Sequence, residues 1–196
     1  MKKNIKKDLI MAPMPVLIIG TYDENGVPNA MNAAWGTQCD MDKIIISLSN
    51  HKTTDNLKLK KAFTVAFATK ETLVESDYFG IESGKGINKI EKAGFHAHKS
   101  EFVDAPVIEE YPVTIECEML KLEDDEGDYR LIGKVVNVVA EESALDDKGR
   151  VDLGKLNLIS YDSATHGYRI IGDIVGQAFH DGLTIKNKQK GKYENL

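Results

Sequence analysis

Short runs rich in β-branched and aromatic residues, separated by turn residues, dominate the first two-thirds of the chain. The first run, residues 15–22 (PVLIIGTY), is followed by Asn25-Gly26, a pair that tolerates the positive φ of a tight hairpin turn. Residues 28–37 are the expected return strand, with a proline at the start, where a lost N–H matters least. Residues 43–48 (KIIISL) are apolar without alternation, which predicts a strand buried on both faces.

Helical signals are shorter and fall between the strands. Thr53 or Thr54 is a suitable N-cap for a helix through residue 61, because a hydroxyl can accept a hydrogen bond from an unpaired first-turn N–H. Gly94 is a suitable C′ residue for a helix over residues 87–93. The pattern also predicts a strand over residues 62–69 and a helix over residues 70–79.

Two further strands, residues 113–120 and 129–140, are predicted as an antiparallel pair around the acidic turn 123–128. Several strands with short helices and no regular βαβ alternation indicate a mainly β (α+β) fold, an antiparallel barrel with short helical additions. No internal repeat or linker interrupts the pattern. We therefore expect a single domain over residues 1–196, with its core at about 12–182 and a basic, polar C-terminal tail at 183–196.

Composition changes this interpretation little. The chain has 196 residues, 42% apolar and 29% charged, which is typical of an ordinary globular domain. A net charge of −6 argues against a nucleic-acid partner. No apolar run approaches the ~20 residues that cross a bilayer, so no membrane association is expected. Cys39 and Cys117 are far apart and form no CxxC motif; small buried thiols in a reducing cytoplasm are expected.

Polar residues are concentrated between Asn25 and Asn56. Asn is depleted in strand interiors, yet Asn29 and Asn32 lie in an expected strand close to the only tryptophan, Trp35. The two amides could hydrogen-bond a planar ring with mixed donors and acceptors, with Trp35 beside its plane. Alternatively, Trp35 anchors the core and the asparagines cap turns.

A second candidate is an anion site between residues 49 and 54. Ser49, His51, Lys52 and Thr53 lie between an apolar strand and a helix start. A helix N-terminus offers unpaired N–H groups and a partial positive charge, which attract phosphate. The alternative is that a threonine caps the helix while His51 and Lys52 face water.

Other candidates carry less specific signals. The glycine-containing loop 83–89 precedes a helix, and Asn88 and Lys89 could reach an anionic ligand or belong to a simple turn. It lacks the third glycine of GxGxxG. His96 and His98 have no nearby third ligand, so we predict no metal site. No nucleophile or metalloprotease motif occurs, and we assign no catalytic side chain.

Read in order, five segments carry a resemblance to a known family. They are PVLIIGTYDENGVPNAMNAAWGT, KIIISLSNHKTTDNLKLKKAFTVAF, SGKGINKIEKAGF, DAPVIEEYPVTIECEM and YRIIGDIVGQAFHDG. The sequence resembles the flavin reductase-like, FMN-binding split-barrel family, and within it the flavoredoxin type. The resemblance implies a six-stranded antiparallel split barrel that forms a homodimer, with FMN held at the subunit boundary.

The resemblance also assigns cofactor contacts. It implies that the flavin ring lies against Asn29, Asn32, Ala33, Ala34 and Trp35. The phosphate would be received by the neighbouring segment, and the loop carrying Asn88 and Lys89 would close near the cofactor. The residues implied for the phosphate segment are Ser47, Leu48, Ser49, His51, Lys52, Thr53 and Asn56. This segment has no arginine, whereas many relatives use one; Lys52 supplies only a point charge.

The function implied by the resemblance is an FMN-dependent oxidoreductase of the flavin reductase type. It would pass electrons from NADH or NADPH through FMN to a flavin, iron or a protein acceptor, because the flavin supplies the redox chemistry. Two alternatives remain open: an FMN-binding electron carrier without its own nicotinamide site, reduced by a redox partner protein, and a non-redox binding module that has lost the cofactor.

Overall fold

A computed structural model describes residues 1–4 and 11–186 of the chain. Most of the predicted C-terminal tail, residues 187–196, lies outside the described residues. The main sheet has seven strands in the order β3-β2-β6-β9-β10-β5-β4, and every neighbouring pair is antiparallel. Its strands are β2 (Leu17–Tyr22), β3 (Pro28–Ala33), β4 (Gly36–Asp40), β5 (Lys43–Leu48), β6 (Ala62–Phe67), β9 (Val113–Asp125) and β10 (Asp128–Ala140).

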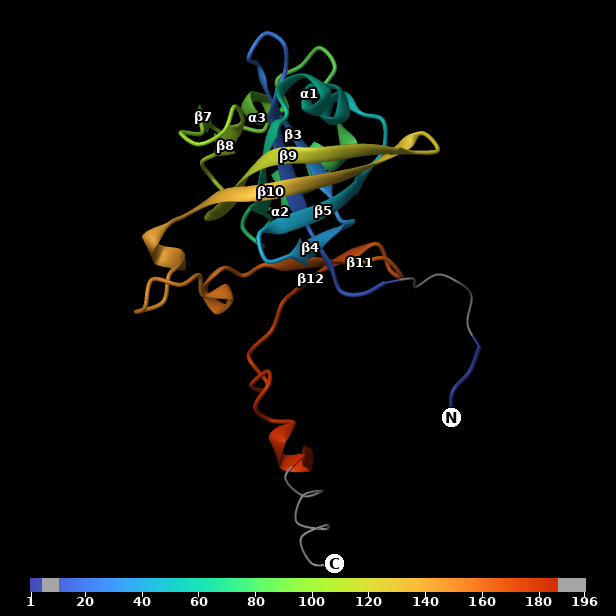
Figure 1. Ribbon diagram of the computed structural model, residues 1–196, viewed down its shortest axis with the longest axis vertical. Helices are drawn as coiled ribbons and strands as arrows, with labels where there is room; N and C mark the ends of the chain where they lie inside the picture. Colours follow the sequence, from blue (N-terminus) through green and yellow to red (C-terminus); the bar gives the residue numbers. More distant parts are fainter. Residues whose placement is uncertain (5–10, 187–196) are drawn as a thin grey trace, which may run out of the picture.

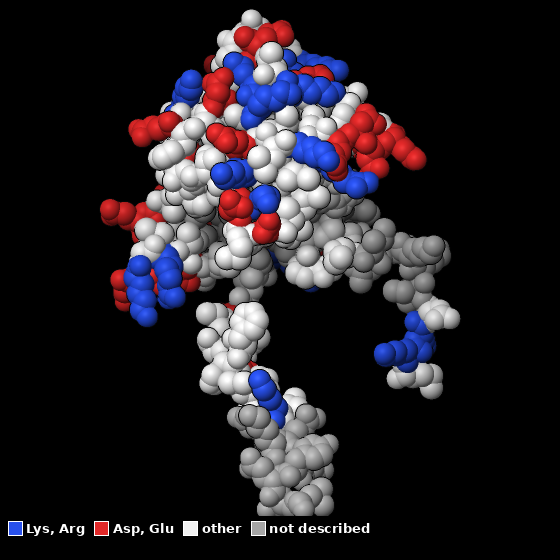
Figure 2. Space-filling view, in the orientation of Figure 1, with Lys and Arg blue, Asp and Glu red and all other residues white. Residues whose placement is uncertain are grey.

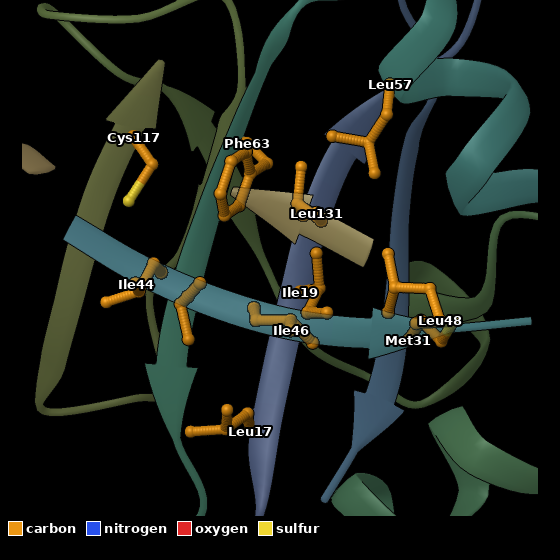
Figure 3. Packing of buried hydrophobic residues seen from close by; sticks show 11 residues of the cluster. Leu17, Ile19, Met31, Ile44, Ile46, Leu48, Leu57, Phe63, Cys117 and Leu131 are labelled. Atoms are coloured by element: carbon orange, nitrogen blue, oxygen red, sulfur yellow. The ribbon is translucent and has the colours of Figure 1, made fainter. Parts of the chain in front are cut away.

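The sheet curls into a barrel around one apolar core. Its two edge strands, β3 and β4, are consecutive in the chain and joined only by Ala34 and Trp35. A Cβ added at Gly36 would meet Leu17 Cδ1 at 2.8 Å, so β4 closes tightly over β2. Figure 3 shows β5 crossing β2 and β3 with their side chains directed into the space between. This core contains Leu17, Ile19, Met31, Ile44, Ile46, Leu48, Leu57, Phe63, Val65, Cys117 and Leu131.

The mainly β, antiparallel split-barrel prediction is confirmed, with three differences in its strands. The expected strand 28–37 is two strands, because the chain turns at Ala34 and Trp35. This division contributes to a main sheet of seven strands, where the resemblance implied six. The prediction that residues 43–48 are buried on both faces is wrong: Ile44, Ile46 and Leu48 are buried, while the opposite face is partly exposed.

In the described part of the chain, the helices packed against the barrel are α1 (Lys52–Lys60), α2 (Leu73–Ile81) and α3 (Lys89–Lys92). The predicted N-cap for α1 is wrong. His51 is the N-cap, and Thr54, in the first turn, accepts a hydrogen bond on Oγ1 from the His51 N–H at 2.9 Å. The prediction for Gly94 fits, since it follows the C-cap of α3 with a φ of 77°.

Smaller elements cover one half of the main sheet. Helices α2 and α3 pack with β7 (Ala97–Lys99) and β8 (Pro106–Ile108) around a second core against β2, β3 and β6.

A three-stranded sheet of β1 (Met14–Pro15), β11 (Ile159–Asp162) and β12 (Gly167–Ile170) lies below the barrel in Figure 1. Short 3-10 helices, η1 (Glu142–Ala144) and η2 (Leu153–Lys155), connect β10 to β11.

The thiols divide between core and surface. Cys117 is fully buried, as expected, and burial raises the pKa of its thiol to about 12. The expectation for Cys39 is wrong, because β4 is an edge strand and exposes it. Among the described residues, no helix has the length and apolar character needed to cross a bilayer.

Candidate functional site

A cavity of about 700 Å³ lies between the edge strand β3, the start of α1, the end of α2 and the β11–β12 hairpin. This volume falls in the range typical of cofactor sites. Most of the site residues predicted from the sequence line it: Asn29, Asn32, Ala33, Ala34, Trp35, Ser47, Leu48, Ser49, His51, Lys52, Thr53 and Lys89.

Strand β3 supplies one wall. Among the described strands it pairs only with β2, so its second edge has backbone N–H and C=O groups outside the ladder. Asn29 and Asn32 are three residues apart on this strand, which spaces them by about 10 Å. The two asparagines therefore mark two separate ends of the cavity.

The first end is formed where Asn29 meets α1. Asn29 is 5% exposed and donates from Nδ2 to Thr53 Oγ1 at 3.0 Å. Its Oδ1 is buried without a hydrogen-bond partner in the described structure. A Cβ built on Gly84 would collide with that oxygen, so the loop approaches Asn29 as closely as a glycine allows. An unpaired buried acceptor is costly unless a ligand or water satisfies it.

The start of α1 gives this end its polarity. Because His51 is the N-cap, the N–H groups of Lys52 and Thr53 lie in the first turn and have no intrahelical acceptor. The Lys52 ammonium lies 3.5 Å from Asp23 Oδ2 and remains partly exposed. A helix N-terminus, a hydroxyl and a lysine at one end favour an anionic group there.

Lys89 fixes the end of α2 against this site. It is 3% exposed and donates from Nζ to the carbonyl oxygens of Phe79 at 2.9 Å and Glu82 at 2.8 Å. Burial lowers the pKa of its ammonium to about 8, and the Glu82 carboxylate opposes that shift. One N–H of the ammonium is left for other acceptors.

The second end surrounds Asn32. Its Nδ2 donates to the Ser76 carbonyl at 2.8 Å, and a Cβ on Gly80 would meet Asn32 Cβ at 3.2 Å. Tyr168 donates its hydroxyl to Asp77 Oδ1 at 2.6 Å. Burial, and then the hydrogen bond to Asp77, raise the pKa of Tyr168 to about 12, so this hydroxyl stays protonated.

The sequence analysis missed the polar side chains that line this second end beside Asn32: Asp77, Tyr161 and Tyr168. Tyr161 pairs with Tyr168 across β11 and β12, and its hydroxyl lies 2.8 Å from His166 Nδ1. The sequence does contain two tyrosines on either side of a glycine-containing turn. They are far from β3 in sequence, however, so the sequence alone did not indicate that they line the same cavity as β3.

Trp35 settles one of the open alternatives. It is 65% exposed and lines the cavity, so the interpretation of Trp35 as a core anchor is wrong. Its carbonyl accepts a hydrogen bond from the Ser47 N–H at 2.8 Å, which fixes the turn between β3 and β4 beside β5. The indole therefore stands at the cavity, free to contact a ligand.

The structure does not bring Asn56 and Asn88 to the cavity. Asn56 is buried and donates to Thr21 Oγ1 at 3.0 Å, so α1 turns it toward β2. Asn88 caps α3, accepting from the Glu91 N–H at 3.3 Å. The geometry gives both asparagines a structural role, and their predicted ligand contacts have no support from it.

The histidines singled out in the sequence lie elsewhere. His96 and His98 pair with Glu110 and Glu109 through Nδ1, at 2.8 and 3.2 Å, and both are exposed. In residues 1–4 and 11–186, no group of three or more His, Cys, Asp or Glu side chains is arranged to hold a metal ion.

The chain matches a known protein family, and its fold matches several solved structures. A model of the family described as "Flavin reductase like domain" matches residues 11–165. Flavoredoxin of Desulfovibrio vulgaris (Miyazaki F) superposes with a TM-score of 0.88 at 30% identity, covering 93% of this chain and 100% of that one. Flavoredoxin from Methanosarcina acetivorans gives 0.85 at 24% identity, covering 94% and 99%. An FMN-binding protein from Thermus thermophilus gives 0.74 at 21% identity, covering 90% and 97%.

Proposed function

The chain belongs to the flavin reductase-like domain family, and from this premise we propose that its cavity binds FMN for an NAD(P)H-dependent oxidoreductase reaction. The observation that carries the proposal is the unpaired, buried Oδ1 of Asn29 beside the α1 N-terminus. A ligand with a hydrogen-bond donor next to an anionic group would pair its donor with the Asn29 Oδ1 and its anionic group with the α1 N-terminus. The ribityl hydroxyls and phosphate of FMN have that arrangement.

The residues present fit the cofactor along the length of the cavity. The first-turn amides of α1, Thr53 Oγ1 and Lys52 would hold the phosphate. Asn29 would accept from the ribityl chain. Asn32, the free edge of β3 and Trp35 would orient the ring. Because the segment has no arginine, the phosphate would be bound by the helix dipole, the Thr53 hydroxyl and the single lysine, Lys52.

When bound, FMN would supply the redox chemistry that links NADH or NADPH to a flavin, iron or protein acceptor. The protein's own contribution is positioning and exclusion of water. Trp35 and the glycine-containing loop flank the cavity, and Lys89 holds the end of α2 in place. Tyr168 keeps its proton and holds Asp77. No side chain is required as a nucleophile.

The proposal includes a homodimer with FMN at the subunit boundary. Ser47 of β5 and Trp35 both line the cavity and are exposed, so the cavity is open to solvent on the side where these two residues lie. A second copy on that side would shield the cavity mouth. Exclusion of water strengthens the electrostatic contacts inside such a site.

A second candidate function is an FMN-binding electron carrier that is reduced by another protein and has no nicotinamide site. It is favoured by the likeness to two flavoredoxins, one of them at 30% identity over almost the whole chain. Asp77 at the second end of the cavity would then face a protein partner instead of a nicotinamide.

An anaerobic titration of the FMN-loaded protein with NADH and with NADPH separates these functions. Bleaching of the visible flavin absorbance by one equivalent of NADH or NADPH supports the reductase. Reduction only by dithionite or a protein donor supports the carrier. Failure to bind FMN, measured by fluorescence, contradicts both and leaves a non-redox binding module.

A further inference from the structure

The second end of the cavity contains a carboxylate that no cation of the described chain neutralises. Asp77 lines the cavity, and its Oδ1 accepts a hydrogen bond from the Tyr168 hydroxyl at 2.6 Å. In residues 1–4 and 11–186, no Lys, Arg or His nitrogen lies within ion-pair distance of this carboxylate. Within the same residues, Oδ2 of Asp77 has no hydrogen-bond donor and is left for a ligand.

Carboxylates on the outer surface have a different environment. Asp104, for example, lies 3.2 Å from the ammonium groups of both Lys60 and Lys99. Figure 2 shows positive and negative side chains interspersed over the face in view. Water and salt screen such surface charges, and neighbouring charges of opposite sign offset them. The charge of Asp77 is half-buried in a cavity and unpaired, so it acts more strongly on a bound ligand.

The hydrogen bond from Tyr168 leaves the charge of Asp77 in place. The raised pKa of Tyr168, about 12, keeps the proton on the tyrosine and the negative charge on the carboxylate. The bond also joins α2 to β12, because Asp77 belongs to the helix and Tyr168 to the strand. The charge is therefore fixed in position before a ligand arrives, which is the arrangement that gives electrostatic stabilisation at little reorganisation cost.

Aromatic rings stand beside this carboxylate. Tyr161 and Tyr168 both line the cavity, with ring centroids 6.2 Å apart and planes inclined at 56°. Trp35 lines the same cavity and is 65% exposed. Aromatic faces stack on flat rings and attract cations. A carboxylate combined with aromatic faces favours a flat ring that carries a positive charge, and it disfavours an anionic ring.

We propose that the second end binds the nicotinamide ring, and that the Asp77 carboxylate stabilises the positive charge that this ring acquires during hydride transfer. This role rests on the proposed function, in which NADH or NADPH is the hydride donor and FMN is the acceptor. The C4–H bond of the neutral dihydronicotinamide breaks, and the hydrogen leaves with both bonding electrons to form a new bond at N5 of the flavin. The nicotinamide is oxidised and left with one positive charge, while the flavin is reduced and gains one negative charge.

The contribution of Asp77 grows as the reaction proceeds. Its attraction for the neutral dihydronicotinamide is small, and it increases as the ring becomes positive. Interactions that are stronger in the transition state than in the bound substrate raise the rate. Asp77 would therefore accelerate the reduction of FMN and favour the oxidised nucleotide, with little effect on the affinity for the reduced nucleotide.

Three small probes with the same ring but different charge test the subsite. Nicotinate is an anion, nicotinamide is neutral and 1-methylnicotinamide is a cation. Ligand-observed NMR measures the affinity of each probe for the FMN-loaded protein. The cation is expected to bind at least about tenfold more tightly than nicotinamide, and nicotinate should bind most weakly. Equal affinities, or tightest binding of the anion, would overturn the proposal.

Asp77→Asn removes the charge and keeps a side-chain oxygen that can accept from Tyr168. It is expected to weaken 1-methylnicotinamide binding about tenfold and to change nicotinamide binding less than about twofold. Glu75→Gln is the matched control, because it removes the same charge from α2 at a residue outside the cavity lining. The control should leave all three affinities unchanged. An equal loss in both variants, or none in Asp77→Asn, contradicts the proposal.

Anaerobic stopped-flow measurement tests the effect on hydride transfer. In Asp77→Asn, reduction of FMN at saturating nucleotide is expected to slow about tenfold, while the affinity for the reduced nucleotide stays within about twofold. A rate equal to that of the parent protein would refute the stabilising role. The comparison of parent and variant with the probes is repeated without FMN. Failure to bind flavin, or failure of both nucleotides to reduce it, would therefore contradict the proposed function, while the probe affinities still decide whether the second end binds a cation.

Discussion

The two ends of the cavity are built from different chemistry, although both rest on the same edge strand. At the first end, Asn29 and Thr53 meet the N-terminus of α1, with Lys52 beside them. At the second end, Asn32 lies near the Tyr168–Asp77 pair, which places a carboxylate within the cavity. The N-terminus of α1 favours an anionic group at the first end, and the Asp77 carboxylate disfavours one at the second end.

This difference gives the cavity a direction. A ligand with a phosphate at one end and a planar, neutral ring at the other can bind in only one orientation without placing its phosphate beside Asp77. The orientation is set mainly by backbone amides and short side chains, which lose little conformational entropy on binding. The comparison therefore predicts large effects from changes at the first end and small effects at the second.

The largest effect is expected from Gly84→Ala. The added methyl would collide with Asn29 Oδ1, so Asn29 must leave its position against Thr53. We expect roughly a hundredfold weaker FMN binding, with a loss of about 1–3 kcal/mol in the free energy of unfolding. Fluorescence titration measures the FMN affinity, and urea unfolding measures the free energy of unfolding. The double variant Asn29→Ala/Gly84→Ala should recover stability without recovering affinity; recovery of both would refute a ligand role for Asn29.

Thr53→Ala is expected to weaken FMN binding roughly tenfold, because one hydrogen bond to a charged phosphate is lost. Thr54→Ala is the matched control, since the neighbouring hydroxyl accepts from the His51 N–H instead of facing the ligand. The control should cost about 1 kcal/mol of stability and leave affinity unchanged. Equal affinity for the Thr53 variant and the parent protein would remove Thr53 from the phosphate site.

The lowered pKa of Lys89 predicts that the free energy of unfolding depends on pH. Its folded-state pKa of about 8 is below the ordinary 10.5, so the unfolded state binds more protons between these values and stability rises with pH in that window. Urea unfolding of the parent and of Lys89→Met should therefore diverge from pH 8 upward, by at most about 1.4 kcal/mol per pH unit. Parallel stability curves would show that burial does not depress the Lys89 pKa.

Asn32→Leu is expected to change the absorbance bands or potential of bound FMN while reducing affinity only a few-fold. The substitution removes the donor to the Ser76 carbonyl and an amide next to the proposed ring position. A visible spectrum and a redox titration detect the change. If both are unaltered, Asn32 serves only to hold α2 against β3.

Tyr168→Phe at the second end should leave FMN affinity within about twofold and cost about 1 kcal/mol of stability, the net value of one hydrogen bond. The hydroxyl bonds Asp77 and has no place in phosphate binding. A loss of affinity as large as that of Thr53→Ala would abolish the distinction between the two ends.

Local sequence patterns predicted the elements of the barrel because turn residues and apolar runs determine strands with little outside help. Residues 43–48 and the Asn25-Gly26 turn are examples, since their neighbours in sequence are also their partners in space. The break at Ala34 and Trp35 was missed because nothing local ends that strand. Closure of the barrel bends the chain there.

The first end of the cavity was largely predictable, because residues 47–53 lie in one segment and carry a recognisable helix start. The second end was not. Asp77 and Tyr168 are 91 positions apart, and their contact depends on how the β11–β12 hairpin packs beside α2. The unsatisfied Oδ1 of Asn29 also appears only once the tertiary contacts of the residue are known.

The most direct test of the account is a crystal structure of the protein grown with FMN. Density for FMN is expected in the cavity, with a phosphate oxygen within about 2.5–3.2 Å of Thr53 Oγ1 and the ring next to Asn32 and Trp35. The opposite orientation, with the phosphate toward Asp77, or FMN bound outside this cavity, would contradict it.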